Sequence, residues 1–220
     1  DSSGGVVAMS NQGVVVENCH FIGQDLYDDS GGLGGRGIDQ NIESIDEDTE
    51  IITRSTFIDC TTKCRNMHNN SGGILGAYSK YTDVSNCTVE AVDIEDAEGG
   101  NIGLGGLSNG AGGIGGKRSF YLHIDNCYVK CNSVEGKYSG GILGGDPKAS
   151  LVENSYVITK SGFTGERSGG IFGGHGQDNA VVNSYVVGDV RGSRSGAVFG
   201  AYAKFTRSTD NTNTFIDMDA

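Results

Sequence analysis

A glycine-rich hexapeptide recurs along the 220-residue chain. It reads SGGILG at 71–76 and 139–144, SGGIFG at 168–173 and SGAVFG at 195–200. A phosphate-binding loop is needed once, whereas a motif repeated at intervals indicates a structural unit stacked on itself. Openings of this type begin at Ser3, Ser30, Ser71, Ala111, Ser139, Ser168 and Ser195. Their spacing gives a unit of about 28 residues with two enlarged copies, so we expect seven units in a single domain spanning 1–220.

A second landmark lies downstream of the openings and sets the register of the repeat. A cysteine or serine follows 16 residues after five of them, at Cys19, Cys87, Cys127, Ser155 and Ser184. In the second unit the sequence predicts Ser55 as the counterpart, 25 residues after the opening, which implies about nine inserted residues. The third unit carries a long tail after its landmark.

Each unit has the pattern of strands and turns. Short runs of β-branched and aromatic residues are bounded by glycine, asparagine and aspartate, and apolar spacing typical of helices is absent. The pattern predicts an all-β fold, a parallel β-solenoid of about seven coils, two of them enlarged by insertions. Coils stacked at about 4.8 Å would extend roughly 34 Å along the axis. A right-handed β-helix is the expected hand, because parallel crossovers are almost always right-handed.

Stacked coils place equivalent residues in columns. The fourth position of every opening is aliphatic, so we expect it to point inward: Val6, Leu33, Ile74, Ile114, Ile142, Ile171 and Val198. The sixth position is Ala8 in the first unit and glycine in the others, which predicts a place where the coil narrows or bends.

Two further columns flank the second landmark. Asparagine precedes it at positions 18, 86, 126, 154 and 183, where a side-chain ladder and left-handed backbone are expected. The residues after it are expected to face outward: His20, Thr56, Thr88, Tyr128, Tyr156 and Tyr185. The last three would form a stacked tyrosine ladder.

Charge and motifs exclude several classes of function. The net charge of -12 disfavours nucleic acid and anionic membranes as partners, and no apolar run is long enough to span a bilayer. GLGGRG at 32–37 satisfies a dinucleotide-binding pattern but falls in the repeat column, so structural glycine is the better interpretation. The four histidines lie in different units, and we interpret them as isolated polar residues.

Two acidic clusters are candidates for calcium loops. Asp46, Glu47 and Asp48 lie in the second unit's insertion, and Asp93 and Asp96 lie in the third unit's tail. Oxygen-rich loops bind calcium, but the spacing matches no established calcium motif, so solvated acidic loops are favoured and no cofactor is expected. We find no row of carboxylates of the kind that β-helix polysaccharide lyases and hydrolases use.

Six cysteines and two sequons bear on the compartment. An even number of cysteines fits an oxidising environment. Cys87 and Cys127 share a column, where a disulfide and a ladder of buried thiols are equally compatible with the spacing. Cys60 and Cys64 are close enough in sequence to pair across a turn. Asn69 and Asn86 are sequon asparagines open to N-glycosylation in a secreted eukaryotic protein.

The pattern SGGILGG…VENSYVITKSG resembles GLUG-type repeats of secreted and surface proteins. Those repeats carry a G-G-L-V-G opening followed by a short strand with an N-C/S-Y-S/V core. The resemblance covers essentially the whole chain, most closely 111–200. It implies a β-helix-like stack with extracellular display, in stalks or adhesive surfaces.

We therefore expect an extracellular structural or adhesive protein without enzymatic activity. The first opening begins at the third residue and the last unit stops three residues after Asp217, so we expect uncapped end coils. Such ends suit head-to-tail self-assembly or continuation by flanking repeats. The alternative function is a glycan-binding or glycan-cleaving β-helix protein.

Overall fold

The computed structural model describes residues 3–39, 54–91, 106–107, 109–204, 206–209 and 212–214. Within these ranges the chain forms strands and turns, and no helix occurs. The first sheet contains β1 (Val15–Glu17), β4 (Ser55–Ile58), β7 (Thr82–Ser85), β10 (His123–Asp125), β13 (Leu151–Glu153), β15 (Ala180–Val182) and β17 (Arg207–Thr209). The second contains β2 (His20–Ile22), β5 (Thr61–Cys64), β8 (Thr88–Ala91), β11 (Tyr128–Cys131), β14 (Tyr156–Thr159), β16 (Tyr185–Val187) and β18 (Thr212–Thr214). The third contains β3 (Asp25–Leu26), β6 (Asn66–Met67), β9 (Gly106–Leu107) and β12 (Ser133–Val134).

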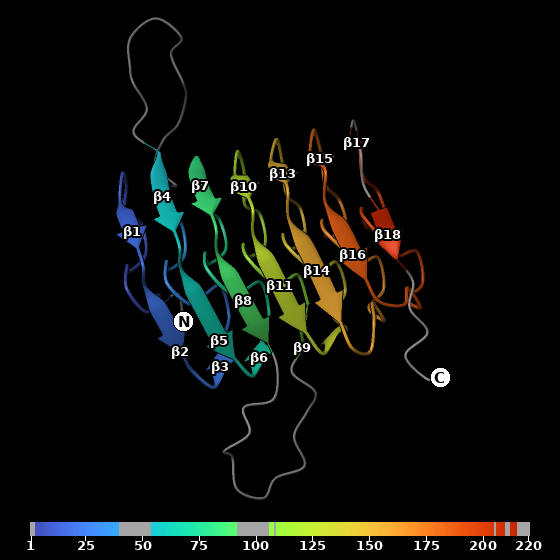
Figure 1. Cartoon of the computed structure of the whole chain (residues 1–220), viewed down its shortest axis with the longest axis horizontal. Coiled ribbons are helices and arrows are strands. Elements are labelled where there is room, and N and C mark those ends of the chain that lie inside the picture. Colours follow the sequence, from blue (N-terminus) through green and yellow to red (C-terminus); the bar gives the residue numbers. More distant parts are fainter. Residues whose placement is uncertain are drawn as a thin grey trace, which may run out of the picture.

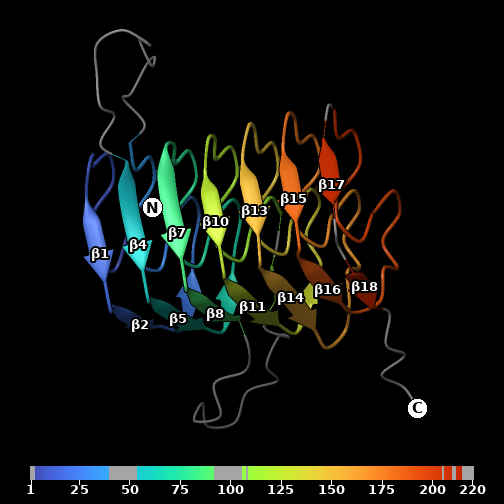
Figure 2. The ribbon, with the colours of Figure 1, turned by 45° about the horizontal axis from the view of Figure 1, so that its top comes forward.

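Every strand pairs in parallel with the equivalent strand of the next coil. The first two sheets have seven strands each, in the order of the coils along the chain. Figure 1 shows the strands side by side from blue to red, and Figure 2 shows the two long sheets meeting at an angle. This is a parallel β-solenoid of about seven coils, as the repeat predicted.

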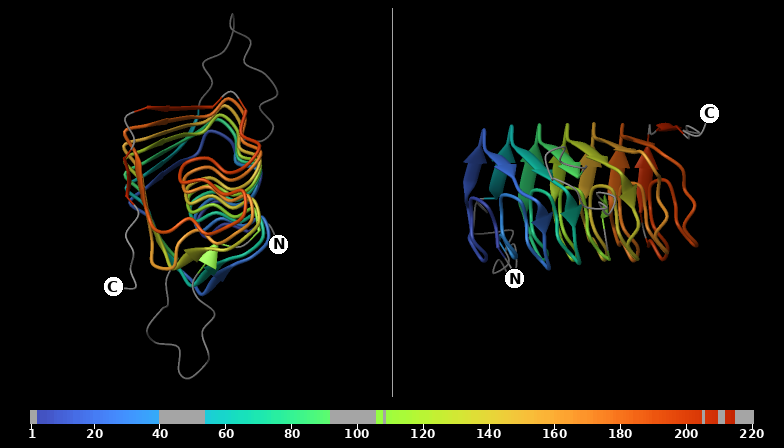
Figure 3. Two further views of the ribbon diagram at one scale, coloured as in Figure 1. Left: turned by 90° about the vertical axis from the view of Figure 1, so that its right-hand side faces the viewer. Right: turned by 90° about the horizontal axis from the view of Figure 1, so that it is seen from below.

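The glycine-rich openings fold into the interior of each coil. Seen along the axis, they form an inner set of stacked loops (Figure 3). Their backbones bridge from coil to coil, for example Gly140 to Gly169 and Gly169 to Gly196. A Cβ atom at Gly169 would lie 1.9 Å from the carbonyl oxygen of Phe172, so backbone contact excludes a side chain there. At the sixth position, a Cβ on Gly173 would meet the carbonyl oxygen of Tyr138 at 2.2 Å.

The second coil corrects one predicted register. Ser55 begins β4, which pairs with β1 and β7, so it lies one strand earlier than the landmark. Thr61 is the partner of His20, which makes Cys60 the counterpart of Cys19. Thr56 accordingly pairs with Val15 on the first sheet and is absent from the His20 column. RSTFID was aligned with the landmark segments because both contain a short β-branched or aromatic run followed by a polar turn. That resemblance led to the wrong register for the second coil.

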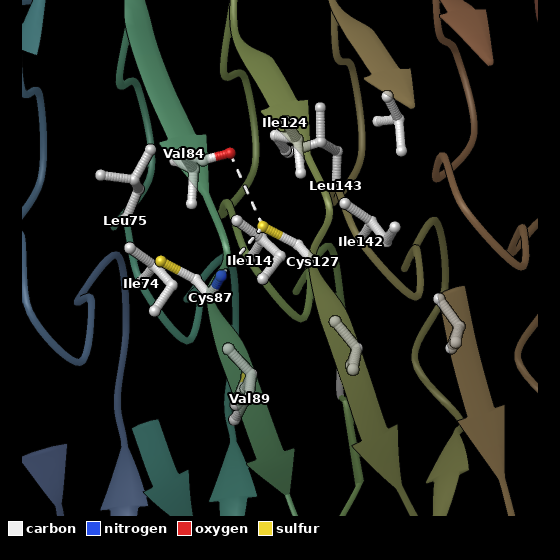
Figure 4. Packing of buried hydrophobic residues seen from close by; sticks show 14 of the residues in the cluster. Ile74, Leu75, Val84, Cys87, Val89, Ile114, Ile124, Cys127, Ile142 and Leu143 are labelled. Carbon is white, nitrogen blue, oxygen red and sulfur yellow. Dashed lines mark hydrogen bonds between the residues drawn. The ribbon is translucent and has the colours of Figure 1, made fainter. Parts of the chain in front are cut away.

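The core is a set of aliphatic columns inside the coils. Ile74, Ile114, Ile142 and Ile171 are fully buried in this core. Figure 4 shows the first three of them beside Val84 and Ile124 of the first sheet. In the first coil no preceding coil covers this column, and the side chain of Val6 is 52% exposed. The inward position predicted from the sequence is therefore buried wherever a coil lies on both sides.

Candidate functional site

An acid–histidine cluster crosses three neighbouring coils on the outer face of the first sheet. His123 on β10 pairs in register with Asp83 on β7. Its Nδ1 lies 4.0 Å from Asp83 Oδ1, and its Nε2 lies 2.6 Å from Glu153 Oε1 on β13. One imidazole thus bridges two carboxylates that come from the coils on either side.

An arginine fixes one end of this cluster. Arg54 Nε donates a hydrogen bond to Asp83 Oδ1 at 2.7 Å, and its Nη2 donates to the carbonyl oxygen of Tyr121 at 2.9 Å. The side chains of Arg54, Asp83, His123 and Glu153 all remain partly exposed, between 30% and 41%. The cluster is therefore held in place by a cation and is open to a solute.

A third carboxylate, that of Asp125, lies beside Glu153 in the cluster. Asp125 pairs in register with Glu153 on the next coil and accepts a hydrogen bond from Asn154 Nδ2 at 2.8 Å. Asp125 and Glu153 are the one in-register carboxylate pair on this face in the described part of the chain, because Ser85 and Val182 occupy the same column on either side of them. Asp83, Asp125 and Glu153 are separated by a repeat or more in sequence, so the cluster becomes visible only when the strands are set in register. Carboxylates beside an imidazole are groups that can transfer protons.

The histidines are not isolated, contrary to the interpretation from sequence. His20 Nδ1 lies 2.5 Å from Thr61 Oγ1 on the adjacent coil. The ring of His68 stacks on Tyr27 with centroids 4.8 Å apart, and His175 contacts tyrosine rings of neighbouring coils. Each partner is about one repeat away in the chain, which a search for local motifs does not detect.

The three predicted ladder tyrosines lie in register on the outer face of the second sheet. Tyr128 stacks on Tyr156 with ring centroids 4.5 Å apart, and Tyr156 stacks on Tyr185 at 4.8 Å. The pKa of Tyr128 and that of Tyr185 are raised above the usual value for tyrosine. Partial burial is the largest cause, and the charge interaction with Tyr156 is the second. The three stacked rings form a continuous aromatic strip along the axis.

The cysteine column serves as a hydrogen-bond ladder. Cys87 N donates to Cys127 Sγ at 3.4 Å, and Cys127 N donates to Ser155 Oγ at 3.0 Å (Figure 4 shows the first of these). Ser155 N continues the series to Ser184 Oγ at 3.1 Å. Here the landmark side chain supplies an acceptor to the preceding coil, which explains why the column holds cysteine in the first four coils and serine in the next two.

All six cysteines are unpaired thiols in this structure. Of the two alternatives for Cys87 and Cys127, it shows the thiol ladder, because parallel neighbours in a column carry Cβ vectors that run side by side. The proposed Cys60–Cys64 pair was wrong. Cys60 precedes β5 and Cys64 ends it, so extended backbone separates them by roughly 10 Å or more, beyond disulfide reach.

The buried thiols are poorly ionised. Burial raises the pKa of Cys60 to about 11 and the pKa of Cys64 and Cys131 to about 12. The hydrogen bond with Cys127, together with burial, raises the pKa of Cys87 as well. These environments suit packing and do not activate a thiol as a nucleophile.

The other predicted site residues have the following places. Asp46, Glu47, Asp48, Asp93 and Asp96 lie outside the described residues. The sequon asparagines at 69 and 86 are exposed. Among the residues that the structure describes, no group of three or more His, Cys, Asp or Glu side chains is arranged to hold a metal ion.

Comparisons with known proteins give no match. No family model fits the sequence, and no curated protein or solved structure is detectably similar to the chain. In the described part of the chain, no helix is long and apolar enough to cross a membrane.

Proposed function

We propose that this chain is an extracellular structural or adhesive repeat protein of the GLUG type, which extends a fibre or stalk by end-to-end stacking of its coils. The glycine openings and the N-C/S-Y core support the assignment to this type of repeat. The proposal on assembly rests on the first coil. Its outer edge has exposed apolar side chains and edge strands, as expected of a surface that another coil covers.

Apolar exposure is concentrated on the first coil. Among the described residues, the large hydrophobic side chains that are exposed and are not tyrosine are Val6, Met9, Val15 and Ile22, all in this coil. Ile22 is 74% exposed. Isolated exposed apolar residues are ordinary, but a cluster of them on one end favours an interaction surface.

The backbone at this end is also available for pairing. β1, β2 and β3 are edge strands of their sheets, each with one neighbouring strand among the described residues. Beside them lies a pocket of about 260 Å³, lined in part by Gly5, Phe21 and Leu26. Edge strands next to an apolar pocket favour addition of further strands.

The opposite end offers a matching surface, so we commit to a second copy of the chain as the occupant. Val198 and Phe199 are partly buried and pack against the core in the last opening. If the register continues across the junction, Val198 of one copy meets Val6 of the next in the same column. By the same register, Arg207 on β17 lies beside Val15 of the next copy and Thr209 lies beside Glu17, so the first sheet continues from β17 into β1.

Sedimentation velocity of the purified chain over a range of concentrations tests this proposal. We expect concentration-dependent growth for the parent and a monomer for Val6→Asp, which places a charge in the junction. Tyr121→Asp is the matched control, because Tyr121 is exposed on the side of a middle coil. A parent that stays monomeric throughout, or a control that blocks growth equally, refutes self-assembly. Coils supplied by flanking sequence then become the alternative occupant.

The acid–histidine cluster favours a second candidate function, cleavage of a glycan. Asp125 and Glu153 are side by side on neighbouring coils, with His123 against Glu153. Incubation with pectin, alginate and host glycans tests it. Cleavage that Glu153→Gln abolishes would establish an enzyme and overturn the non-enzymatic proposal. Intact polysaccharides with the parent protein would rule out this candidate for those substrates.

A further inference from the structure

At the turns that directly flank the glycine-rich openings of coils four to seven, six large residues have left-handed backbone: Arg118, Tyr138, Arg167, His175, Arg194 and Tyr202. We call this surface the turn edge. We propose that the turn edge binds an anionic polysaccharide, carboxylated or sulfated, that runs along the solenoid axis. This deepens the glycan-binding alternative and does not depend on assembly, because it concerns a side of the solenoid and not its ends.

The backbone conformation of the turn edge argues for a role beyond folding. The φ angles lie between 57° and 66°, a region that residues with a Cβ atom adopt at a cost, and Gly, Asn and Asp at the least cost. The landmark turns of the same solenoid follow that rule, with Asn126, Asn154 and Asn183 at similar φ. At the turn edge the fifth coil follows the rule with Asp146, but the chain otherwise places arginine, tyrosine and histidine. Strained positions that retain such side chains are typical of functional surfaces.

The side chains alternate cations with aromatic rings. The guanidinium of Arg167 lies 5.4 Å from the centroid of the Tyr138 ring and 5.2 Å from that of Tyr202. His175 lies 4.9 Å from each of these two rings. Arg194 Nη1 donates a hydrogen bond to Tyr202 Oη at 3.3 Å. These contacts connect five of the six planar groups across neighbouring coils, whereas the sixth, Arg118, contacts Tyr78 and pairs with Asp146.

The strip is positively charged on a protein that is otherwise acidic. Lys117 and Lys137 lie next to Arg118 and Tyr138 in the same turns, and they add two ammonium groups to the three arginines. Asp146 and Glu166 are the carboxylates that form ion pairs with these cations. Positive groups therefore exceed negative ones here, although the whole chain carries a net charge of -12.

These groups match the chemistry of an acidic polysaccharide. Guanidinium groups bind carboxylate and sulfate through paired hydrogen bonds, and tyrosine faces provide apolar contact with a polar tip. A linear polymer parallel to the axis meets a new turn at every coil, so weak contacts add along its length. A duplex nucleic acid presents a denser array of phosphates, which the acidic remainder of the chain repels.

Binding to polygalacturonate, dextran sulfate, neutral dextran and a short DNA duplex tests the proposal, measured by biolayer interferometry on the intact chain. The main variant is Arg118→Asn with Arg194→Asn, which removes two exposed cations and installs residues that tolerate the left-handed turn. We expect binding to at least one of the acidic polysaccharides, none to neutral dextran, and about a tenfold weaker Kd for the variant. The acidic polymer that binds more tightly identifies the charged group.

Matched controls separate this surface from general charge effects. Lys130→Asn with Lys160→Asn removes the same charge from exposed positions elsewhere, and we expect its Kd to match the parent. Tyr202→Asn keeps the charge but removes a ring that is 53% exposed, and we expect weaker binding with an unchanged Tm. The proposal is overturned if neither acidic polymer binds, if the lysine control loses as much affinity as the arginine variant, or if duplex DNA binds more tightly.

Discussion

The side-chain amide of Asn126 donates a hydrogen bond to Oδ1 of Asn86 at 2.8 Å, although the two residues are forty positions apart. Asn183 makes the same bond to Asn154, also at 2.8 Å. Both donors have left-handed backbone, with φ of 49° and 45°. One residue type therefore meets two requirements at the landmark turn, the backbone conformation and the link to the preceding coil.

Substitutions at Asn126 separate these two requirements. Asn126→Ala loses the hydrogen bond and strains the backbone, so we expect a loss of about 1–2 kcal/mol in the free energy of unfolding. Asn126→Gly loses only the bond, and its expected cost is about 1 kcal/mol or less. Urea denaturation of both variants provides the measurement. Equal stability for the alanine variant and the parent would show that the turn is not constrained in this way.

The register of the core predicts opposite outcomes for two substitutions in one column. Ile171 is fully buried between coils, so Ile171→Asp places an unpaired charge in the core and should cost about 4 kcal/mol or more. Val6→Asp introduces the same charge at the open end and should cost about 0.5 kcal/mol or less in dilute protein. Thermal unfolding followed by circular dichroism measures both. An Ile171→Asp protein that melts like the parent would contradict the register.

The buried thiols predict a loss of stability in alkali. The pKa of Cys64 and Cys131 is raised from 9.0 to about 12 in the folded state, because burial disfavours the thiolate. Above pH 9 the unfolded thiols release protons while the folded ones retain them, so stability falls as the pH rises toward 12. Between pH 8 and pH 10 the two thiols together should reduce the free energy of unfolding by roughly 2 to 3 kcal/mol.

The double variant Cys64→Ala with Cys131→Ala provides the control. Ala91 occupies the position between them on the intermediate coil, so alanine fits the column, with a baseline cost of about 1 kcal/mol for each site. Urea denaturation across this pH range should give a flatter profile for the variant. Identical slopes for variant and parent would mean that these thiols titrate in the folded protein as they do when unfolded.

The repeat made the solenoid predictable, whereas the contacts between columns were harder to foresee. The openings and the Asn-Cys/Ser landmarks recur at constant spacing, so Ile171 and Tyr156 could be placed from sequence alone. The acid–histidine cluster could not, because His123 meets Glu153 only through strand register and a diagonal side-chain contact. The landmark of the second coil was misplaced because an insertion lies between its opening and its landmark. No repeated residue within that stretch shows how many residues were inserted.

Electron microscopy of the purified chain tests the proposed assembly most directly. Seven coils at about 4.8 Å give each copy an axial length of roughly 34 Å, so a continuous stack should form rods whose lengths are multiples of that value. We expect such rods from the parent at high concentration and single particles from Val6→Asp under the same conditions. Particles of the parent that remain single at every concentration would contradict end-to-end stacking of this chain.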